Sequence, residues 1–228
     1  MHPFRFGVQL SRAESAAEWR ALVRRIEDLG FSTVYMPDHL DDQWSPLVAL
    51  TVAAEATTRL RVGTLVLCND FRHPQLLARE AATLDLLSGG RFELGLGAGW
   101  MTTDYDASGL PLDPPAVRVA RLAEAVEVIR ALWTGGPTDA AGDHYRLTAA
   151  SGYPAPAGVP TLLIGGGSRH VLTLAGRHAD VVGVNPALTA GAIGAEVLAS
   201  AQADQYDQRL DWVRAAPAIA TTKSNCRS

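Results

Sequence analysis

The 228-residue sequence has only two cysteines, Cys68 and Cys226, which are too few and too far apart to suggest a disulfide framework or a zinc site. Its histidines form no metal-ligand constellation either, so no metal is expected. It also lacks the uninterrupted apolar run of about 18 residues that a membrane-spanning helix needs. The chain begins directly with a strand-like segment, which leaves no room for a signal peptide. We therefore expect a cytoplasmic protein.

Clusters of positive charge are absent as well. The formal net charge is −4 and the pI is about 5.8, which argues against nucleic acid or an anionic membrane as the main partner and favours a small-molecule substrate. No G-x-S-x-G elbow is present, so nucleophilic catalysis by serine or cysteine has no support. What the chain does contain is 47% hydrophobic and 19% charged residues, enough for one large core in one domain.

Alternating strand and helix patterns organise this core. Apolar stripes predict helices between strands, and the strands fall in six segments: 4–10, 32–36, 61–68, 92–97, 161–164 and 181–184. A spacing of about 30 residues between the first strands suits either a barrel or a doubly wound parallel sheet. Two segments rich in glycine and proline, 104–115 and 137–158, are predicted to be irregular, and the first is typical of an active-site loop. A last helix is expected over 197–213.

Three of these strands end in unusual sequences: Pro37-Asp38-His39, Gly97-Ala98-Gly99-Trp100 and Gly165-Gly166-Gly167-Ser168-Arg169. Parallel strands in sheets and barrels bind ligands at their carboxyl ends, so we expect the three turns to converge on one site. Gly97 and Gly99 would let bare backbone approach a ligand there.

Each turn has a chemical and a plain interpretation. Asp38-His39 combines a carboxylate with an imidazole, which suits proton exchange with a substrate, but Asp38 could merely cap a turn beside a solvated His39. The triple glycine before Ser168 suits a phosphate at a helix N-terminus, but it could be an ordinary tight turn. The segment 95–99 lacks the complete G-x-G-x-x-G dinucleotide fingerprint.

The ordered series of motifs resembles the luciferase-like monooxygenase superfamily. The resemblance rests on Val34-Tyr35-Met36-Pro37-Asp38-His39, on Phe71-Arg72-His73-Pro74, and on the run from Leu86 to Trp100, and it extends through Pro160–Ser168 and Ala179-Asp180. It covers about residues 4–216, and its nearest branch uses the deazaflavin coenzyme F420 and is commonly dimeric. A series of motifs in order is far more specific than one glycine loop.

This resemblance implies a TIM-type (β/α)8 barrel that carries the cofactor across its strand ends. Asp38 would contact the tricyclic ring, and His39 would be the catalytic acid or base. Leu65 and Val66 would hold a non-prolyl cis peptide behind the ring. The remaining cofactor contacts would come from Ala98 and Gly99 beside the cofactor chain, and from Gly166, Gly167, Ser168 and Arg169 at its phosphate.

The implied function is hydride transfer between F420 and a small organic substrate, performed by a homodimer. If the cofactor is FMN instead, the same pocket would support monooxygenation. A third alternative is a non-catalytic remnant or a partner subunit.

The sequence departs from the family pattern at its end. A complete barrel needs two more strand-helix units after residue 216, whereas residues 217–228 have no helical or strand period. We therefore divide the chain into an incomplete barrel domain over 1–216, with six units, and an unpatterned tail over 217–228. We expect a truncated or frame-shifted family member whose first and sixth strands have unpaired edges.

Overall fold

The computed structural model describes residues 4–188, 191–192 and 194–216. The predicted tail, with Cys226, lies outside the described residues. The strands are β1 (Gly7–Gln9), β2 (Thr33–Met36), β3 (Arg61–Thr64), β4 (Leu67–Cys68), β5 (Phe92–Gly97), β6 (Thr138–Ala141), β7 (Arg146–Ala150), β8 (Thr161–Gly166) and β9 (Val181–Val184). The α-helices are α1 (Ala16–Asp28), α2 (Pro46–Ala56), α3 (Pro74–Ser88), α4 (Thr102–Ser108), α5 (Pro115–Leu132), α6 (Arg169–His178), α7 (Ala195–Ala199) and α8 (Ala203–Arg214), and a 3-10 turn covers Asn69–Phe71.

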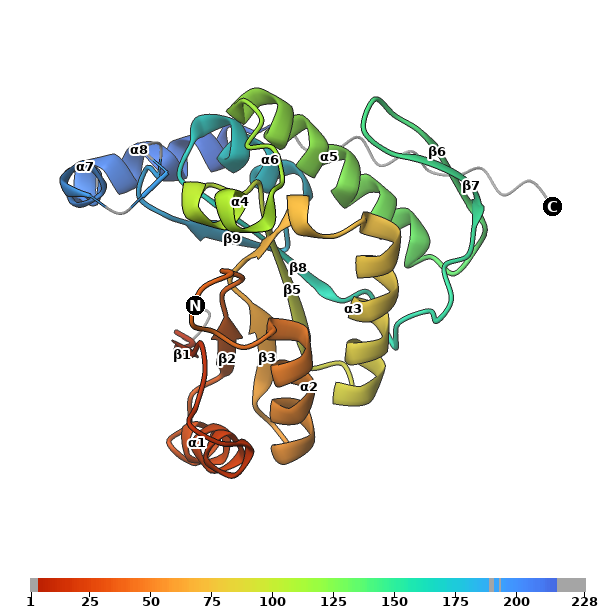
Figure 1. Ribbon diagram of the computed structural model, residues 1–228, viewed down its shortest axis with the longest axis vertical. Helices are drawn as coiled ribbons and strands as arrows, with labels where there is room; N and C mark the ends of the chain where they lie inside the picture. Colours follow the sequence, from red (N-terminus) through yellow and green to blue (C-terminus); the bar gives the residue numbers. More distant parts are fainter. Residues whose placement is uncertain (1–3, 189–190, 193, 217–228) are drawn as a thin grey trace.

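The core of the molecule is one parallel sheet in the order β1-β2-β3-β5-β8-β9, with β4 also paired to β5. Every strand pair in this sheet is parallel, which confirms the predicted series of strand-helix units. Helices such as α2 and α3 pack beside the strands of the sheet (Figure 1). Because the strands are parallel, their carboxyl ends all lie at the same edge of the sheet. β1 and β9 are its two outer strands and do not pair with each other in the described part of the chain, so the barrel is open.

Local sequence signals explain where the helices begin and end. The Ser15 hydroxyl accepts a hydrogen bond from the Glu18 N–H at the start of α1, and Ser168 caps α6 in the same way. Pro74 opens α3, and Gly89 ends it with a φ of +67°. These signals fix where α1, α3 and α6 begin and where α3 ends.

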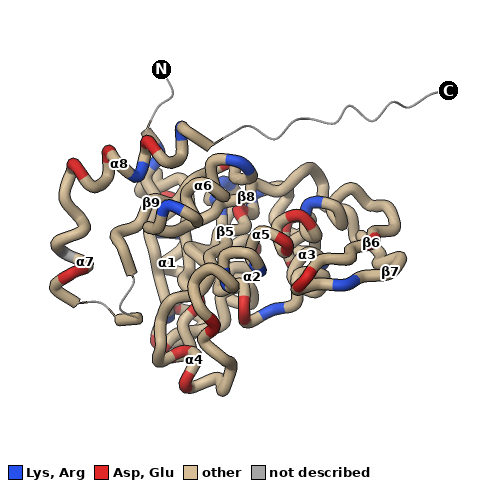
Figure 2. Tube along the Cα trace, turned by 90° about the horizontal axis from the view of Figure 1, so that it is seen from above, with Lys and Arg blue, Asp and Glu red and all other residues tan. Residues whose placement is uncertain are grey.

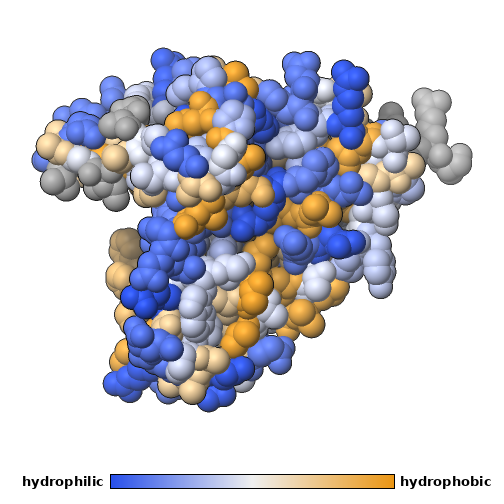
Figure 3. Space-filling view, in the orientation of Figure 1, coloured by the Kyte–Doolittle hydropathy of each residue, from blue (hydrophilic) through white to orange (hydrophobic). Residues whose placement is uncertain are grey.

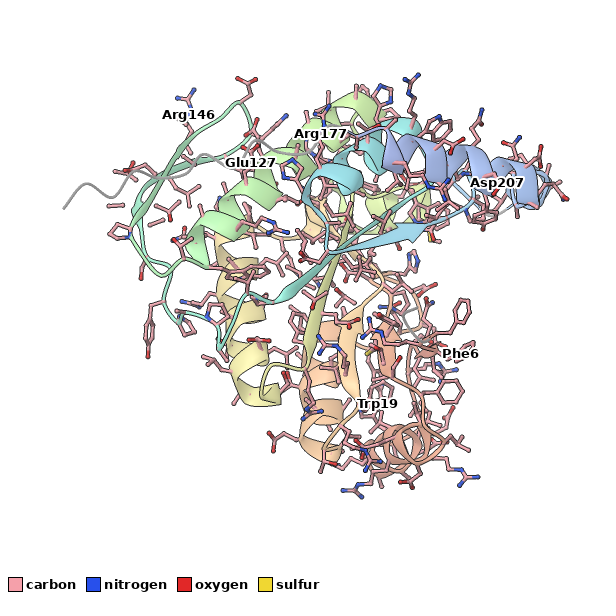
Figure 4. The ribbon with its side chains drawn as sticks, turned by 180° about the vertical axis from the view of Figure 1, so that it is seen from behind. Phe6, Trp19, Glu127, Arg146, Arg177 and Asp207 are labelled. Carbon is pink, nitrogen blue, oxygen red and sulfur yellow. The ribbon has the colours of Figure 1, made fainter. Side chains whose placement is uncertain are left out.

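The buried core lies between the sheet and its helices. Phe92, Leu94 and Leu96 of β5 are fully buried, as expected for the central strand of a parallel sheet. Trp19 of α1 is also fully buried, and its indole N–H donates to the Ala49 carbonyl oxygen of α2 at 3.0 Å. Figure 4 shows Trp19 inside the fold and Phe6 at the outer side of the sheet, where Phe6 is 68% exposed beside the free edge of β1.

The outer surface has two plain features. Basic and acidic residues are interspersed along the chain rather than gathered in blocks (Figure 2). Apolar residues are visible on the face formed by α2 and α3 (Figure 3), where Val48, Leu76 and Leu87 are more than half exposed. None of the helices in the described ranges is long and apolar enough to cross a bilayer.

Four sequence-based expectations need correction. The segment 104–115 is not wholly irregular, because α4 forms at its start. The segment 137–158 contains the antiparallel hairpin of β6 and β7. The predicted strand 61–68 divides into β3 and β4, and the predicted last helix divides into α7 and α8. In each case a short element has too few residues to show a clear apolar period.

Candidate active site

A cavity of about 360 Å³ opens at the carboxyl ends of the parallel strands. All three unusual turns line it: Asp38 and His39 after β2, the segment 97–100 after β5, and the segment 165–168 after β8. The predicted convergence is thus confirmed. The volume lies in the range of about 300–1,000 Å³ that is common for small-molecule and cofactor sites. Leu65 and Val66 also line the cavity and are joined by a non-prolyl cis peptide, which confirms the predicted bond. Arg169 is not among the lining residues.

His39 is held in the cavity wall by a carboxylate. Its Nδ1 lies 2.8 Å from Asp104 Oδ2, and the backbone N–H of Leu40 donates to Asp104 Oδ1 at 3.0 Å. Trp100 packs edge-on against the imidazole, with ring centres 5.8 Å apart. A carboxylate on Nδ1 favours the tautomer that carries a proton there, which leaves Nε2 to accept a proton. The pair therefore has the geometry of an oriented acid or base.

Asp104 is the functional residue that the sequence did not single out. It lies on α4, 65 residues from His39, in a segment that the sequence predicts to be an active-site loop. Asp104 could have been found from its position shortly after the glycine-rich end of β5. That strand end and His39 are both expected at the carboxyl edge of the sheet, so a carboxylate there is a candidate partner for His39. α4 itself is anchored by a hydrogen bond from the Thr102 N–H to the Gly191 carbonyl oxygen at 3.0 Å.

Asp38 is committed to protein partners. Arg72 binds both of its carboxylate oxygens, at 2.9 Å to Oδ1, and the Cys68 N–H donates to Oδ2 at 3.0 Å. Burial lowers the pKa of Arg72, but the Asp38 carboxylate outweighs this and raises it overall. Asp38 lines the cavity, so a contact with a cofactor ring stays a prediction, and its negative charge is already balanced by Arg72.

A second polar chain runs from the cavity wall, which Cys68 and Tyr105 line, to Arg121 of α5. The Tyr105 hydroxyl donates to Asp70 Oδ2 at 2.8 Å and lies 3.6 Å from Cys68 Sγ, while Arg121 forms an ion pair with Asp70 at 2.9 Å. Burial raises the pKa of the Cys68 thiol to about 11, and burial together with Cys68 and Asp70 raises the pKa of Tyr105 well above its ordinary value. Both groups are therefore protonated at neutral pH, which suits a structural role rather than nucleophilic attack.

The glycines at the ends of β5 and β8 also make room for neighbouring side chains. A Cβ atom on Gly97 would lie 2.7 Å from Val66 Cγ2, and one on Gly165 would lie 2.9 Å from Val66 Cγ1, so these glycines make room for Val66. A Cβ atom on Gly99 would overlap the Tyr105 hydroxyl. Gly97 and Gly99 also line the cavity, so the approach of their backbone to a ligand stays a prediction, and the structure adds a packing reason for each glycine.

The glycine loop before α6, residues 165–168, packs tightly against the backbone after β9 and also has backbone N–H groups that make no hydrogen bond in the described part of the chain. The backbone after β9 requires Gly167, because a Cβ atom there would lie 2.7 Å from the Asn185 carbonyl oxygen. Ser168 Oγ accepts a hydrogen bond from the Val171 N–H at 3.4 Å. Within the described ranges, the N–H groups of Ser168 and Arg169 have no acceptor. The loop is thus a tight turn that still presents donors at a helix N-terminus, where an anion is favoured.

The cavity has one cationic arginine in its lining, Arg118 of α5, among the described residues. Its Nε donates to the Asp113 carbonyl oxygen at 2.9 Å, and Nη1 donates to the Gly99 carbonyl oxygen. Arg118 therefore ties the loop before α5 to the end of β5. In the described part of the chain, no group of three or more His, Cys, Asp or Glu side chains is arranged to hold a metal ion.

Comparison with known proteins gives consistent results. The chain is 34% identical over 165 residues to an F420-dependent glucose-6-phosphate dehydrogenase of Amycolatopsis mediterranei, which covers 68% of this chain and 49% of that protein. It is 36% identical over 146 residues to the 4-hydroxyprotoasukamycin monooxygenase of Streptomyces nodosus subsp. asukaensis, covering 62% and 37%. The coenzyme F420 dependent tetrahydromethanopterin reductase of Methanopyrus kandleri matches with a TM-score of 0.72 and 28% identity, over 80% of this chain and 56% of that one.

The chain spans about half the length of the curated relatives it matches. A sequence profile described as luciferase-like monooxygenase matches residues 1–224. This match covers nearly the whole chain, and the parallel sheet, the cis peptide at Leu65–Val66 and the cavity at the strand ends accompany it. The chain belongs to the luciferase-like monooxygenase family.

Proposed function

We propose that this chain is an F420-dependent oxidoreductase that acts on a small organic substrate. The observation that carries the proposal is the His39–Asp104 pair, which lies in the same cavity as a glycine loop with free N–H donors. Relatives named as F420-dependent enzymes support the choice of cofactor. When bound, F420 would supply hydride chemistry at its deazaflavin ring.

The residues present fit such a cofactor. The cavity has apolar walls, including Leu65, Val66 and Phe71, that suit a flat aromatic ring. The Ser168 and Arg169 N–H groups and the N-terminus of α6 suit a phosphate at one end. The same cavity is also lined by Ala98, Gly99, Gly166 and Gly167, so their backbone is available to the cofactor chain.

His39 then exchanges the proton that accompanies hydride transfer. Asp104 holds Nδ1, so the proton is accepted or donated at Nε2. Trp100 packs against the imidazole and limits the access of water to one side of it. Arg72 forms an ion pair with Asp38, so the cofactor ring would meet a paired carboxylate and not an isolated negative charge.

A second candidate is an FMN-dependent monooxygenase. The observation in its favour is the 36% identity to 4-hydroxyprotoasukamycin monooxygenase. In this case the same loop before α6 would bind the FMN phosphate. The homodimer implied by the resemblance also stays a proposal, and the apolar face of α2 and α3 is the surface on which we would place it.

Titration of the purified chain with F420 and with FMN, followed by cofactor fluorescence and absorbance, tests the proposal. We expect saturable binding of F420 that is tighter than binding of FMN. Tighter FMN binding together with oxygen uptake by the reduced complex would favour the monooxygenase. Binding of neither cofactor would overturn both candidates and favour a non-catalytic remnant or partner subunit.

A further inference from the structure

Arg209 of α8 is a buried arginine outside the cavity wall. Only 3% of its surface is exposed. Its Nε donates to the Gly167 carbonyl oxygen at 3.3 Å, and its Nη1 donates to the Ser200 carbonyl oxygen at 2.8 Å. None of the ion pairs within the described residues includes Arg209. A buried cation is costly unless an anion or oriented dipoles compensate it, so its place calls for a partner.

The position of Arg209 is fixed by the packing of α8 on α6. These two helices lie side by side at one end of the sheet (Figure 1). A Cβ atom on Gly176 would lie 2.5 Å from the Val213 carbonyl oxygen, so the two helix backbones approach closely at this glycine. The guanidinium also lies 5.4 Å from the centre of the Tyr206 ring, which holds it from a third direction.

The hydrogen bond to Gly167 sets the direction of the next amide. The peptide between Gly167 and Ser168 is trans, so its C=O and N–H point in opposite directions. Because the C=O points to Arg209, the Ser168 N–H points away from Arg209. This N–H has no acceptor in the described part of the chain, and Ser168 lines the cavity.

We propose that Arg209 is a positioning residue that orients the Gly167–Ser168 amide and adds positive charge behind it, so that the loop selects the phosphate-bearing form of the cofactor. The proposal rests on the proposed cofactor function. Two observations carry it independently of the helix N-terminus: the near-complete burial of a cation without a carboxylate partner, and its direct bond to the loop. Phosphate at the loop would provide the missing negative charge.

The test compares ligands with and without phosphate. Dissociation constants are measured by fluorescence for F420 and for the deazaflavin riboside that lacks the phosphate, and likewise for FMN and riboflavin. The full chain is used as wild type, Arg209→Gln, Arg209→Lys and Arg214→Gln. Arg214 is the matched control, because it lies on the same helix but is exposed and contacts only Asp211.

Wild type is expected to prefer the phosphate-bearing ligand, and Arg209→Gln to lose about tenfold of that preference while the phosphate-free ligand binds as before. Arg209→Lys should recover part of the preference, and Arg214→Gln should keep all of it. Because a buried charge is poorly screened, the loss should persist in high salt.

Equal weakening of both ligands in Arg209→Gln, or an unchanged preference, would overturn the inference and leave the cofactor proposal standing. Failure of wild type to bind any of the four ligands would overturn the cofactor proposal and the inference together. Thermal unfolding of each variant separates these results from loss of fold. If Arg209→Gln does not fold, Arg209→Lys decides: a phosphate preference below that of wild type supports the role, and a wild-type preference overturns it.

Discussion

Replacing Gly99 by alanine tests whether the packing of the Tyr105 hydroxyl requires a glycine at this position. Gly99 has a φ of +76°, and an added Cβ atom would overlap the Tyr105 hydroxyl and lie 2.8 Å from Cys68 Sγ. Gly109 is the matched control, because its φ is +72° and a Cβ atom there would meet no atom within 4 Å. The two glycines therefore share the backbone penalty and differ in the steric one.

The expected costs follow from these contacts. Gly109→Ala should lower the free energy of unfolding by about 1 kcal/mol, the cost of a left-handed alanine. Gly99→Ala adds displacement of Tyr105 and loss of its hydrogen bond to Asp70, which adds about 2 kcal/mol because the acceptor is charged and buried. The total for Gly99→Ala is then about 3 kcal/mol.

A double-mutant cycle with Tyr105→Phe, measured by urea unfolding, isolates the contact. Without the hydroxyl, the nearest Tyr105 ring atom would lie 3.1 Å from the added Cβ. Gly99→Ala in the Tyr105→Phe background should therefore cost about 2 kcal/mol less than in wild type, a coupling of about 2 kcal/mol, while the cost of moving Cys68 Sγ remains in both backgrounds. Equal costs for Gly99→Ala and Gly109→Ala, or additive effects in the cycle, would refute this reasoning.

Three further predictions concern catalysis, the loop and acid stability. His39→Ala should reduce kcat by about 10² to 10⁴ with cofactor affinity nearly unchanged, and Asp104→Asn should show a smaller loss of kcat; a large loss of affinity would contradict the role of His39. Gly167→Asp should weaken phosphate-bearing cofactors most, because it puts bulk against the Asn185 carbonyl and a negative charge at the loop; equal weakening of phosphate-free ligands would argue against this. Burial raises the pKa of Glu27, but three backbone N–H groups that donate to its carboxylate lower that pKa overall. The contribution of Glu27 to stability is therefore present above the ordinary carboxyl pKa of about 4.3, and it is lost as the pH falls through the lowered pKa of the folded state. The difference in urea midpoint between wild type and Glu27→Gln should shrink as the pH falls toward 3, and a constant difference would exclude this linkage.

Much of the fold could be read from the sequence because its strands and helices carry strong periodic patterns and clear caps. β5 and its preceding helix are an example: the apolar alternation of Phe92, Leu94 and Leu96 and the glycine pair at 89–90 predicted both elements. The cis peptide at Leu65–Val66 followed only from the resemblance, since no local residue pattern marks it, and the division of the strand 61–68 at this bond was missed. The split between α7 and α8 has no glycine or proline to announce it.

The site was predictable as a place more than as a set of contacts. Strand ends must meet at one edge of a parallel sheet, so the convergence of His39, Gly99 and Gly167 followed from topology alone. The partners of His39, Asp38 and Gly167 did not, because Asp104, Arg72 and Arg209 are each distant in sequence from the residue they bind and reach it only through packing.

Val66, between β3 and β4, constrains the residues that β5 and β8 can carry next to it. Its two methyl groups fill the space that the missing side chains of Gly97 and Gly165 leave free. A Cβ atom added to Gly95 would lie 3.3 Å from Val66 Cγ1. A larger side chain at position 66 would collide with the backbone of β5 and β8. A side chain at position 97 or 165 would collide with the Val66 methyl groups. Across homologous sequences these positions should thus change in concert, with alanine admitted at 97 or 165 only where residue 66 has itself become smaller.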